Sequence, residues 1–168
     1  ADIGTGTGAI AITLALEVPG SRCLATDLSR DALDQARANA ANLDADRAIE
    51  FRAGDYLEPL VGHAPFDLIC SNPPYIAHRV IETLEPEVRD HDPLLALDGG
   101  GDGLDAYRVF ARGADAYLHP GGHLVLEIGF DQRNAVAALL DEASNWGAVH
   151  LQEDLSGNDR VIVAQKHP

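Results

Sequence analysis

Apolar residues recur at intervals of three or four in four stretches of the chain, which is the spacing of one face of an α-helix. These positions are Ile10, Leu14 and Val18; Leu33, Ala36, Ala40 and Leu43; Val109, Phe110, Ala114, Tyr117 and Leu118; and Val136, Leu139 and Leu140. Pro19-Gly20 ends the first stretch, and Ser29 can cap the second. The pattern predicts four helices, each with one face turned toward a core.

Short apolar or alternating runs separate these helices and predict strands. They span residues 23–27, 49–51, 66–70, 124–128, 148–154 and 160–165. Residues 76–104 are rich in acids, Pro and Gly, and we expect a loop there. Strands that alternate with helices form a mostly parallel sheet with helices on both faces. The last two strands, joined by residues 156–159, predict an antiparallel C-terminal hairpin at one edge of this α/β fold.

The composition narrows the classes of function. The chain has 168 residues, which favours one domain over residues 1–168. Acidic residues outnumber basic ones 27 to 12, and the formal charge of −15 argues against direct nucleic-acid binding. No apolar run reaches the roughly 18 residues of a membrane span. Cys23 and Cys70 lie in apolar runs and fit buried thiols in a reducing compartment. We therefore expect a cytoplasmic protein with no membrane partner.

The first residues look like the end of a strand that runs into a glycine loop. Ala1-Asp2-Ile3 stands directly before Gly4, and the apolar residues that would build the rest of such a strand are not in the sequence. Met is also absent from the chain. We therefore expect a domain that is truncated within its first strand.

A glycine loop, Gly4-Thr5-Gly6-Thr7-Gly8, stands between that strand end and the first predicted helix. Glycine lets the backbone turn tightly and approach a ligand closely. Asp27 ends the second predicted strand, where a carboxylate can accept hydrogen bonds from two ribose hydroxyls. Loop and acid together predict a nucleotide site at the carboxyl edge of the sheet.

The spacing and charge around this loop indicate which nucleotide binds. The nicotinamide fingerprint is G-x-G-x-x-G, whereas this loop reads G-x-G-x-G directly after Asp2 and Ile3. A carboxylate beside the loop repels a pyrophosphate but suits a ligand with an ammonium or sulfonium group. These features favour S-adenosylmethionine over a dinucleotide.

The most specific signal is Asn72-Pro73-Pro74-Tyr75, which directly follows the predicted strand at 66–70. The two prolines restrict the backbone and can hold the Asn72 side-chain oxygen and the Pro73 carbonyl as rigid acceptors. Two such acceptors match the two N–H donors of a planar NH₂ group, and Tyr75 offers an aromatic face to pack on it. The loop therefore predicts recognition of a primary amide or an exocyclic amine.

Together these motifs resemble the amino methyltransferases of the Rossmann type, and longer matches narrow the resemblance to the PrmC/HemK family. The further matching segments are Gly54-Asp55, residues 87–108, Glu127-Ile128-Gly129 and residues 154–161. The resemblance covers essentially the whole chain. It implies a Rossmann-like class I methyltransferase fold with S-adenosylmethionine as the methyl donor.

The family methylates the side-chain amide nitrogen of a glutamine in the Gly-Gly-Gln motif of peptide chain release factors, so the resemblance implies release factors as the protein partner. It implies cofactor contacts by Asp2, Gly4, Thr5, Gly6, Thr7, Gly8, Asp27, Asp55, Tyr56 and Asn72. It implies catalytic roles for Asn72, Pro73 and Tyr75, which with Pro74 hold the glutamine amide. This chain departs from the family at Tyr56, where tryptophan is more usual. It also lacks a counterpart of the family's N-terminal helical domain.

Other functions remain open at this stage. An adenine or guanine amino-methyltransferase acting on DNA or RNA uses a similar Asn-Pro-Pro-Tyr loop. A nicotinamide-dependent oxidoreductase and a binding module that keeps the fold without catalysis are further alternatives. We expect no metal site, because Pro120-Gly121-Gly122 separates His119 from His123. Asp98, Asp102 and Asp105 lie among glycines that suit a substrate-side loop better than a calcium site.

Overall fold

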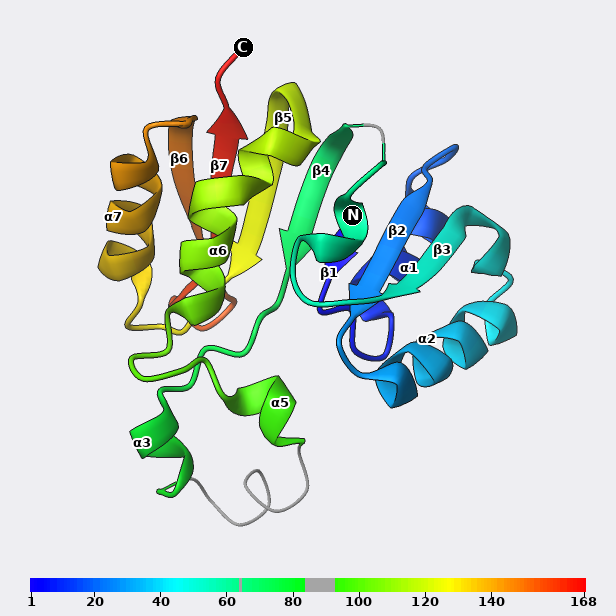
Figure 1. Cartoon of the computed structure of the whole chain (residues 1–168), viewed down its shortest axis with the longest axis horizontal. Coiled ribbons are helices and arrows are strands. Elements are labelled where there is room, and N and C mark those ends of the chain that lie inside the picture. The colour runs from blue at the N-terminus through cyan, green and yellow to red at the C-terminus, as the bar shows by residue number, and fades with distance from the viewer. Residues whose placement is uncertain (64, 84–92) are drawn as a thin grey trace.

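The computed structural model describes residues 1–63, 65–83 and 93–168, and Figure 1 shows their arrangement. Seven strands form one sheet in the order β3-β2-β1-β4-β5-β7-β6. The strands are β1 (Asp2–Ile3), β2 (Cys23–Asp27), β3 (Ile49–Ala53), β4 (Phe66–Ser71), β5 (Leu118–Glu127), β6 (Trp146–Glu153) and β7 (Asp159–Lys166).

The pairing directions confirm the mixed sheet that the sequence predicts. The pairs among β3, β2, β1, β4 and β5 are parallel. By contrast, β7 runs antiparallel to both β5 and β6, so the C-terminal hairpin forms one edge. The short β1 lies in the middle, where Ile3 pairs with Thr26 on one side and with Ser71 on the other.

Helices cover both faces of the sheet, as the alternating pattern predicts. They are α1 (Ala9–Glu17), α2 (Arg30–Asn42), α3 (His78–Ile81), α5 (Leu94–Leu97), α6 (Asp105–Gly113) and α7 (Arg133–Ala143), with 3₁₀ turns at Asp46–Ala48, Glu58–Leu60 and Ala114–Tyr117. Figure 1 shows α6 and α7 in front of the sheet and α1 behind it. Within the described residues, none of these helices has the length and apolar character needed to cross a membrane.

The buried face of α1 differs from the expected one. Val18 lies beyond the end of the helix and is 48% exposed. Instead, Ala11 and Ile12 are buried and belong to a core cluster with Ala25 of β2 and Ala40 of α2. Nearly every residue of α1 is apolar, so spacing along the chain does not by itself select the buried face. In α2 the prediction holds for the buried Leu33, Ala36 and Ala40 and for the cap, since Ser29 accepts a hydrogen bond from the Ala32 N–H.

The third predicted helix is shorter than expected. α6 ends at Gly113, a 3₁₀ turn follows, and Leu118 is the first residue of β5 rather than part of the helix. Leu118 is buried and pairs with Phe66 of β4. Pairing in the sheet therefore determines its structure, and not the helical spacing of the apolar residues. Residues 76–104 are not all loop either, because they include the short helices α3 and α5; residues 84–92 lie outside the described part.

Candidate functional site

The glycine loop and the Asn-Pro-Pro-Tyr loop leave the sheet side by side. Ile3 of β1 and Ser71 of β4 are register partners, so Gly4 and Asn72 are the next residues on two neighbouring parallel strands. The Ser71 hydroxyl donates a hydrogen bond of 2.6 Å to the Ile3 carbonyl and fixes this junction. Neighbouring strands lie only about 4.8 Å apart. The topology thus brings together the two motifs that lie some 65 residues apart in the sequence.

Asp2 supports the glycine loop from beneath. Its side chain is 1% exposed, and one carboxylate oxygen accepts hydrogen bonds from the Thr5 hydroxyl at 2.6 Å and from the Ala11 N–H at 3.0 Å. Burial raises the pKa of Asp2 above its ordinary value, although these two hydrogen bonds oppose the shift. Asp2 therefore ties the loop to the start of α1, and its carboxyl group lies just under the loop.

The loop has the conformation that its glycines permit. Gly4, Gly6 and Gly8 all have positive φ, which favours glycine. An added Cβ at Gly6 would meet nothing within 4 Å, so the outer side of the loop is open, whereas one at Gly8 would lie 3.1 Å from Ala36. The first and second glycines thus leave room for a ligand, and the third allows α1 to pack on α2.

Asp27 reaches the same loop from the end of β2. One carboxylate oxygen accepts a 2.8 Å hydrogen bond from the Gly6 N–H, and the other accepts one of 2.8 Å from the Ser29 N–H. The Thr5 N–H also donates to the Thr26 carbonyl. Since each carboxylate oxygen can accept more than one hydrogen bond, Asp27 keeps acceptor capacity for ribose hydroxyls.

The segment after β3 completes this side of the site. The Gly54 N–H donates to the Asp27 carbonyl at 3.1 Å, which holds the exposed Asp55 next to the end of β2. Tyr56 is half-buried with a positive φ of 38°, and its ring packs edge-on against Phe110 of α6 at 5.7 Å. Burial raises the pKa of Tyr56. The two residues therefore lie at the same sheet edge as Asp27, and their contact with an adenine stays a prediction.

The Asn-Pro-Pro-Tyr loop combines a fixed backbone with an accessible side chain. Pro73 is buried, Pro74 and Tyr75 are half-buried, and Asn72 is exposed. Within the described residues, no hydrogen bond engages the Asn72 amide, so its oxygen is available as an acceptor. The Tyr75 carbonyl, by contrast, accepts a 2.9 Å hydrogen bond from the Gln132 side chain.

A glycine-rich segment, residues 98–105, packs directly on this loop, and we call it the strap. The Ile76 N–H donates to the Leu97 carbonyl, and the Gly99 N–H donates back to the Ile76 carbonyl. A Cβ at Gly99 would lie 2.8 Å from the Pro74 oxygen, and one at Gly103 would lie 2.5 Å from the Tyr75 oxygen. Gly99 and Gly103 are therefore required by close backbone contact, whereas the substrate-side role of this segment stays a prediction.

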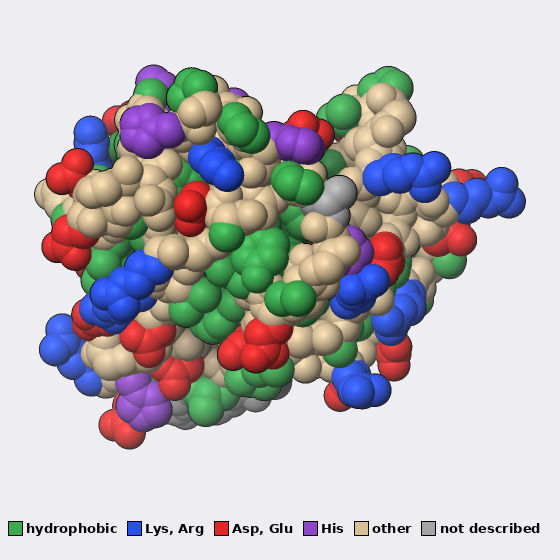
Figure 2. All heavy atoms as spheres, turned by 45° about the horizontal axis from the view of Figure 1, so that its top comes forward, with side chains coloured by type: hydrophobic (Ala, Val, Ile, Leu, Met, Phe, Trp, Pro, Cys, Tyr) green, Lys and Arg blue, Asp and Glu red, His purple; other side chains and the backbone are tan. Residues whose placement is uncertain are grey.

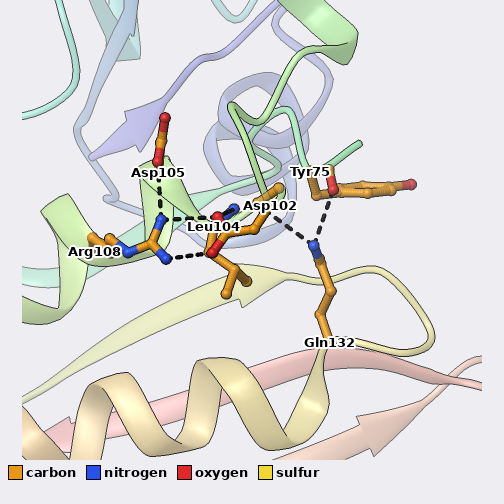
Figure 3. Close-up of polar contacts among 7 residues, drawn as sticks. Tyr75, Asp102, Leu104, Asp105, Arg108 and Gln132 are labelled. Carbon is orange, nitrogen blue, oxygen red and sulfur yellow. Dashed lines mark hydrogen bonds and ion pairs between the residues drawn. The ribbon is translucent and has the colours of Figure 1, made fainter. Parts of the chain in front are cut away.

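The acids of the strap are engaged by neighbouring bases. Asp98 pairs with the ring of His78 at 2.8 Å, which lowers the pKa of Asp98 and raises that of His78. Asp102 and Asp105 both bond the Arg108 guanidinium, as Figure 3 shows. Across residues 1–63, 65–83 and 93–168, no three His, Cys, Asp or Glu side chains gather in a geometry that could hold a metal ion.

Sequence reasoning missed Gln132, which is buried between the Asn-Pro-Pro-Tyr loop and the strap. It follows Glu127-Ile128-Gly129, a segment that the sequence singled out, at the carboxyl edge of β5. A polar residue just past the end of a parallel strand is the signal that could have identified it.

Comparison with known proteins shows close relatives of one kind. The chain is 51% identical over 164 residues to the release factor glutamine methyltransferase of Cereibacter sphaeroides, covering 98% of this chain and 58% of that protein. It is 48% identical over 167 residues to the release factor glutamine methyltransferase of Caulobacter vibrioides, covering 99% of this chain and 57% of that protein. The chain thus spans a little over half the length of these relatives.

Solved structures share the fold. A methyltransferase from Pyrococcus furiosus matches with a TM-score of 0.71 at 18% identity, covering 100% of this chain and 75% of that one. An O-methyltransferase from Bacillus cereus, solved in complex with SAH, matches with a TM-score of 0.65 at 18% identity, covering 98% and 72% of the two chains. The fold is therefore that of the class I methyltransferases, as the sequence predicts.

The family model of the methyltransferase small domain matches residues 1–87, which include the glycine loop, Asp27 and the Asn-Pro-Pro-Tyr loop. These residues are the ones that the structure gathers at the carboxyl edge of the sheet. The chain belongs to the methyltransferase small domain family.

Proposed function

We propose that this chain transfers a methyl group from S-adenosylmethionine to the side-chain amide nitrogen of the Gly-Gly-Gln glutamine of peptide chain release factors. The observation that carries the proposal is the register of Ile3 with Ser71, which sets a nucleotide-type glycine loop beside the Asn72-Pro73-Pro74-Tyr75 loop. Relatives named as release factor glutamine methyltransferases support the choice of substrate. Residues 1–168 act as one methyltransferase domain in this proposal, working in the cytoplasm.

The glycine-loop side of the site fits S-adenosylmethionine. The open space at Gly6 leaves room for a ligand on the backbone, and Asp27 offers the carboxylate that a ribose needs. The buried charge of Asp2 under the loop favours a cationic ligand over a pyrophosphate. A match to a methyltransferase solved with SAH supports the same choice.

The Asn-Pro-Pro-Tyr side of the site fits a primary amide. The Asn72 side-chain oxygen and the Pro73 carbonyl accept the two N–H groups, and the Tyr75 ring packs on the plane of the amide. An amide nitrogen is a poor nucleophile because its lone pair is delocalised into the carbonyl. The two acceptors orient this nitrogen as it takes the methyl group and favour the positive charge that develops on it, which is removed when the nitrogen loses a proton to water. When bound, S-adenosylmethionine supplies a methyl group on a cationic sulfur, so alignment of the nitrogen is the main task of the protein.

The test is methyl transfer from labelled S-adenosylmethionine, with a release factor, DNA and RNA offered separately. We expect label in the release factor, and none in a release factor whose Gly-Gly-Gln glutamine is replaced by alanine. Label in nucleic acid instead would establish the exocyclic-amine alternative.

The acceptor role of Asn72 is tested by two substitutions in the same assay. Asn72→Ala removes an acceptor and should lower transfer by roughly 10²–10³-fold, the scale of losing one preorganised polar contact in a transition state. Asn72→Asp keeps an acceptor oxygen and should retain more activity than Asn72→Ala. If Asn72→Ala transfers the methyl group at the wild-type rate, the loop is only a structural turn and Asn72 has no acceptor role.

A further inference from the structure

The Gln132 side chain connects three segments at the edge of the site. It is 9% exposed, and its oxygen accepts a 2.9 Å hydrogen bond from the Gly129 N–H just after β5. Its NH₂ group donates to the Tyr75 carbonyl at 2.9 Å and to the Gly103 carbonyl of the strap at 3.1 Å. Figure 3 shows the Gln132 nitrogen directed toward Tyr75. The Tyr107 hydroxyl lies 3.3 Å from the Gln132 oxygen.

These partners require an amide at this position. The atom that faces Gly129 must accept from an N–H, and the group that faces Tyr75 and Gly103 must donate to two carbonyls. These needs fix the orientation of the amide. Hydrogen bonds in such a buried place are costly to leave unmade. Glutamine supplies both functions without a charge, whereas a carboxylate would place an oxygen against the Tyr75 and Gly103 oxygens.

The hydrogen bond from Gln132 to the Tyr75 carbonyl restrains the backbone of the Asn-Pro-Pro-Tyr loop. Tyr75 directly follows Pro73-Pro74, whose rings fix their φ angles, so holding the Tyr75 carbonyl limits where the Pro73 carbonyl can lie. The strap also packs against Pro74 and Tyr75 at Gly99. Gln132 is therefore the side chain that joins the loop, the strap and the end of β5.

We propose that Gln132 is a positioning residue that sets the Asn-Pro-Pro-Tyr loop for methyl transfer, although its own side chain does not contact the substrate. This inference rests on the proposed function for its effect on transfer, but its effect on the loop does not depend on that function. The distinction allows the two to be tested separately.

The first variant is Gln132→Glu, compared with the wild-type protein from pH 6 to pH 9. Burial raises the pKa of such a carboxyl, and only its protonated form can donate to the Tyr75 or Gly103 carbonyl. We expect the ratio of variant to wild-type transfer to fall by about 10²-fold at high pH, the scale reported for small misplacements of reacting groups, and to recover as the pH is lowered. The affinity for S-adenosylhomocysteine should stay within roughly threefold of wild type, because the glycine loop is untouched.

The second variant, Gln132→Met, removes donor and acceptor without adding a charge. It should lower transfer at every pH and show no recovery in acid. The matched control is Gln165→Glu, because the Gln165 amide also donates to a backbone carbonyl, that of Gly121 at 3.0 Å, but near the start of β5. This control should leave both transfer and its pH profile unchanged.

Hydrogen exchange supplies a readout that needs no methyl transfer. The N–H groups of Ile76, His78 and Gly99 form hydrogen bonds between the residues just after the loop and the strap or the residue before it. In Gln132→Glu at high pH they should exchange faster than in wild type, while the N–H of Cys70 in β4 keeps its protection. Unchanged exchange in both Gln132 variants would overturn the inference whatever the enzyme does. Faster exchange in a protein that methylates no release factor would leave the positioning role standing and reject the proposed function.

Discussion

Asp2 shows how one buried residue serves the fold and the site in different ways. Its carboxylate accepts from Thr5 and Ala11, yet burial raises its pKa. A carboxyl with a raised folded-state pKa stabilises the fold most below its unfolded pKa of about 3.9, and this contribution is lost as the pH rises through the folded-state pKa. At neutral pH the buried carboxyl group under the loop therefore costs stability.

We predict that Asp2→Asn is at least as stable as wild type at pH 7 and binds S-adenosylmethionine more weakly. The asparagine oxygen preserves both hydrogen bonds but does not ionise. Asp2→Ala is the contrasting variant, because it leaves two buried donors without an acceptor at about 1–3 kcal/mol each. Denaturation curves from pH 4 to pH 8 and calorimetric titration measure the two effects. An equal loss of stability in both variants would show that the charge itself stabilises the fold.

Asp27 is predicted to distinguish the cofactor. Asp27→Ala should weaken S-adenosylhomocysteine binding by ~1.5–3 kcal/mol, the scale of hydrogen bonds to a charged group. Part of this loss comes from the glycine loop, because Asp27 also accepts the hydrogen bond from the Gly6 N–H. The measurement is calorimetry with S-adenosylhomocysteine and, separately, with NAD, which should not bind. Tight NAD binding without S-adenosylhomocysteine binding would contradict the interpretation of the glycine loop.

At the scale of elements, the strap and the Asn-Pro-Pro-Tyr loop behave as one unit. The Ile76 N–H donates to the Leu97 carbonyl, and the Gly99 N–H donates to the Ile76 carbonyl. His78 and Asp98 add a side-chain pair. The segments on either side of residues 84–92 are thereby brought together beside the site. Close backbone contacts in this arrangement explain why glycine stands at Gly99 and Gly103.

Gly103→Ala is predicted to disturb this unit. Gly103 has a φ of +80°, and an added Cβ would lie 2.5 Å from the Tyr75 oxygen and 2.9 Å from the Gln132 nitrogen. The left-handed backbone alone costs an alanine about 1–2 kcal/mol. We expect transfer to fall by roughly 10²-fold with little change in S-adenosylhomocysteine affinity. Gly101→Ala is the control, since its Cβ would meet nothing within 4 Å and its φ is not positive. Equal kcat/KM values for the two variants would show that the strap has no role in methyl transfer.

At the scale of the whole molecule, the charge is unbalanced. The formal charge is −15, and the face in Figure 2 carries basic side chains toward both of its sides with carboxylates among them. Self-repulsion of an excess of one sign opposes the compact state. Salt screens it, because the Debye length falls from about 10 Å at 0.1 M to about 3 Å at 1 M.

We therefore predict that sodium chloride stabilises the protein at pH 7.5. If the free energy of unfolding rises by ~1 kcal/mol between 0.05 and 0.5 M sodium chloride, Tm should rise by about 2–4 °C for a domain of this size. Thermal unfolding followed by circular dichroism gives the measurement. Salt-sensitive binding to duplex DNA in the same buffers should be undetectable. A Tm that falls with salt would mean that attractive ion pairs outweigh the excess of carboxylates.

The sequence by itself determined the features that depend on local backbone rules. The glycine loop, the Ser29 cap and the Pro73-Pro74 turn all depend on conformations that particular residues favour or impose. The alternation of strands and helices followed from apolar spacing, and it predicted the mixed sheet and its terminal hairpin. These patterns were sufficient to place both loops at one edge of the sheet.

Only the tertiary structure decided what depends on contacts between distant residues. Ala11 and Ile12, not Val18, face the core, and Leu118 belongs to β5 rather than to the predicted helix. The spacing of apolar residues along the chain does not show which of them tertiary packing will bury. For the same reason, the sequence did not reveal that Gln132 joins Tyr75 to Gly103, since the donor and its acceptors are 57 and 29 residues apart. The hydrogen bonds of a buried amide are set by the chain segments that surround it, and those are fixed only when the sheet assembles.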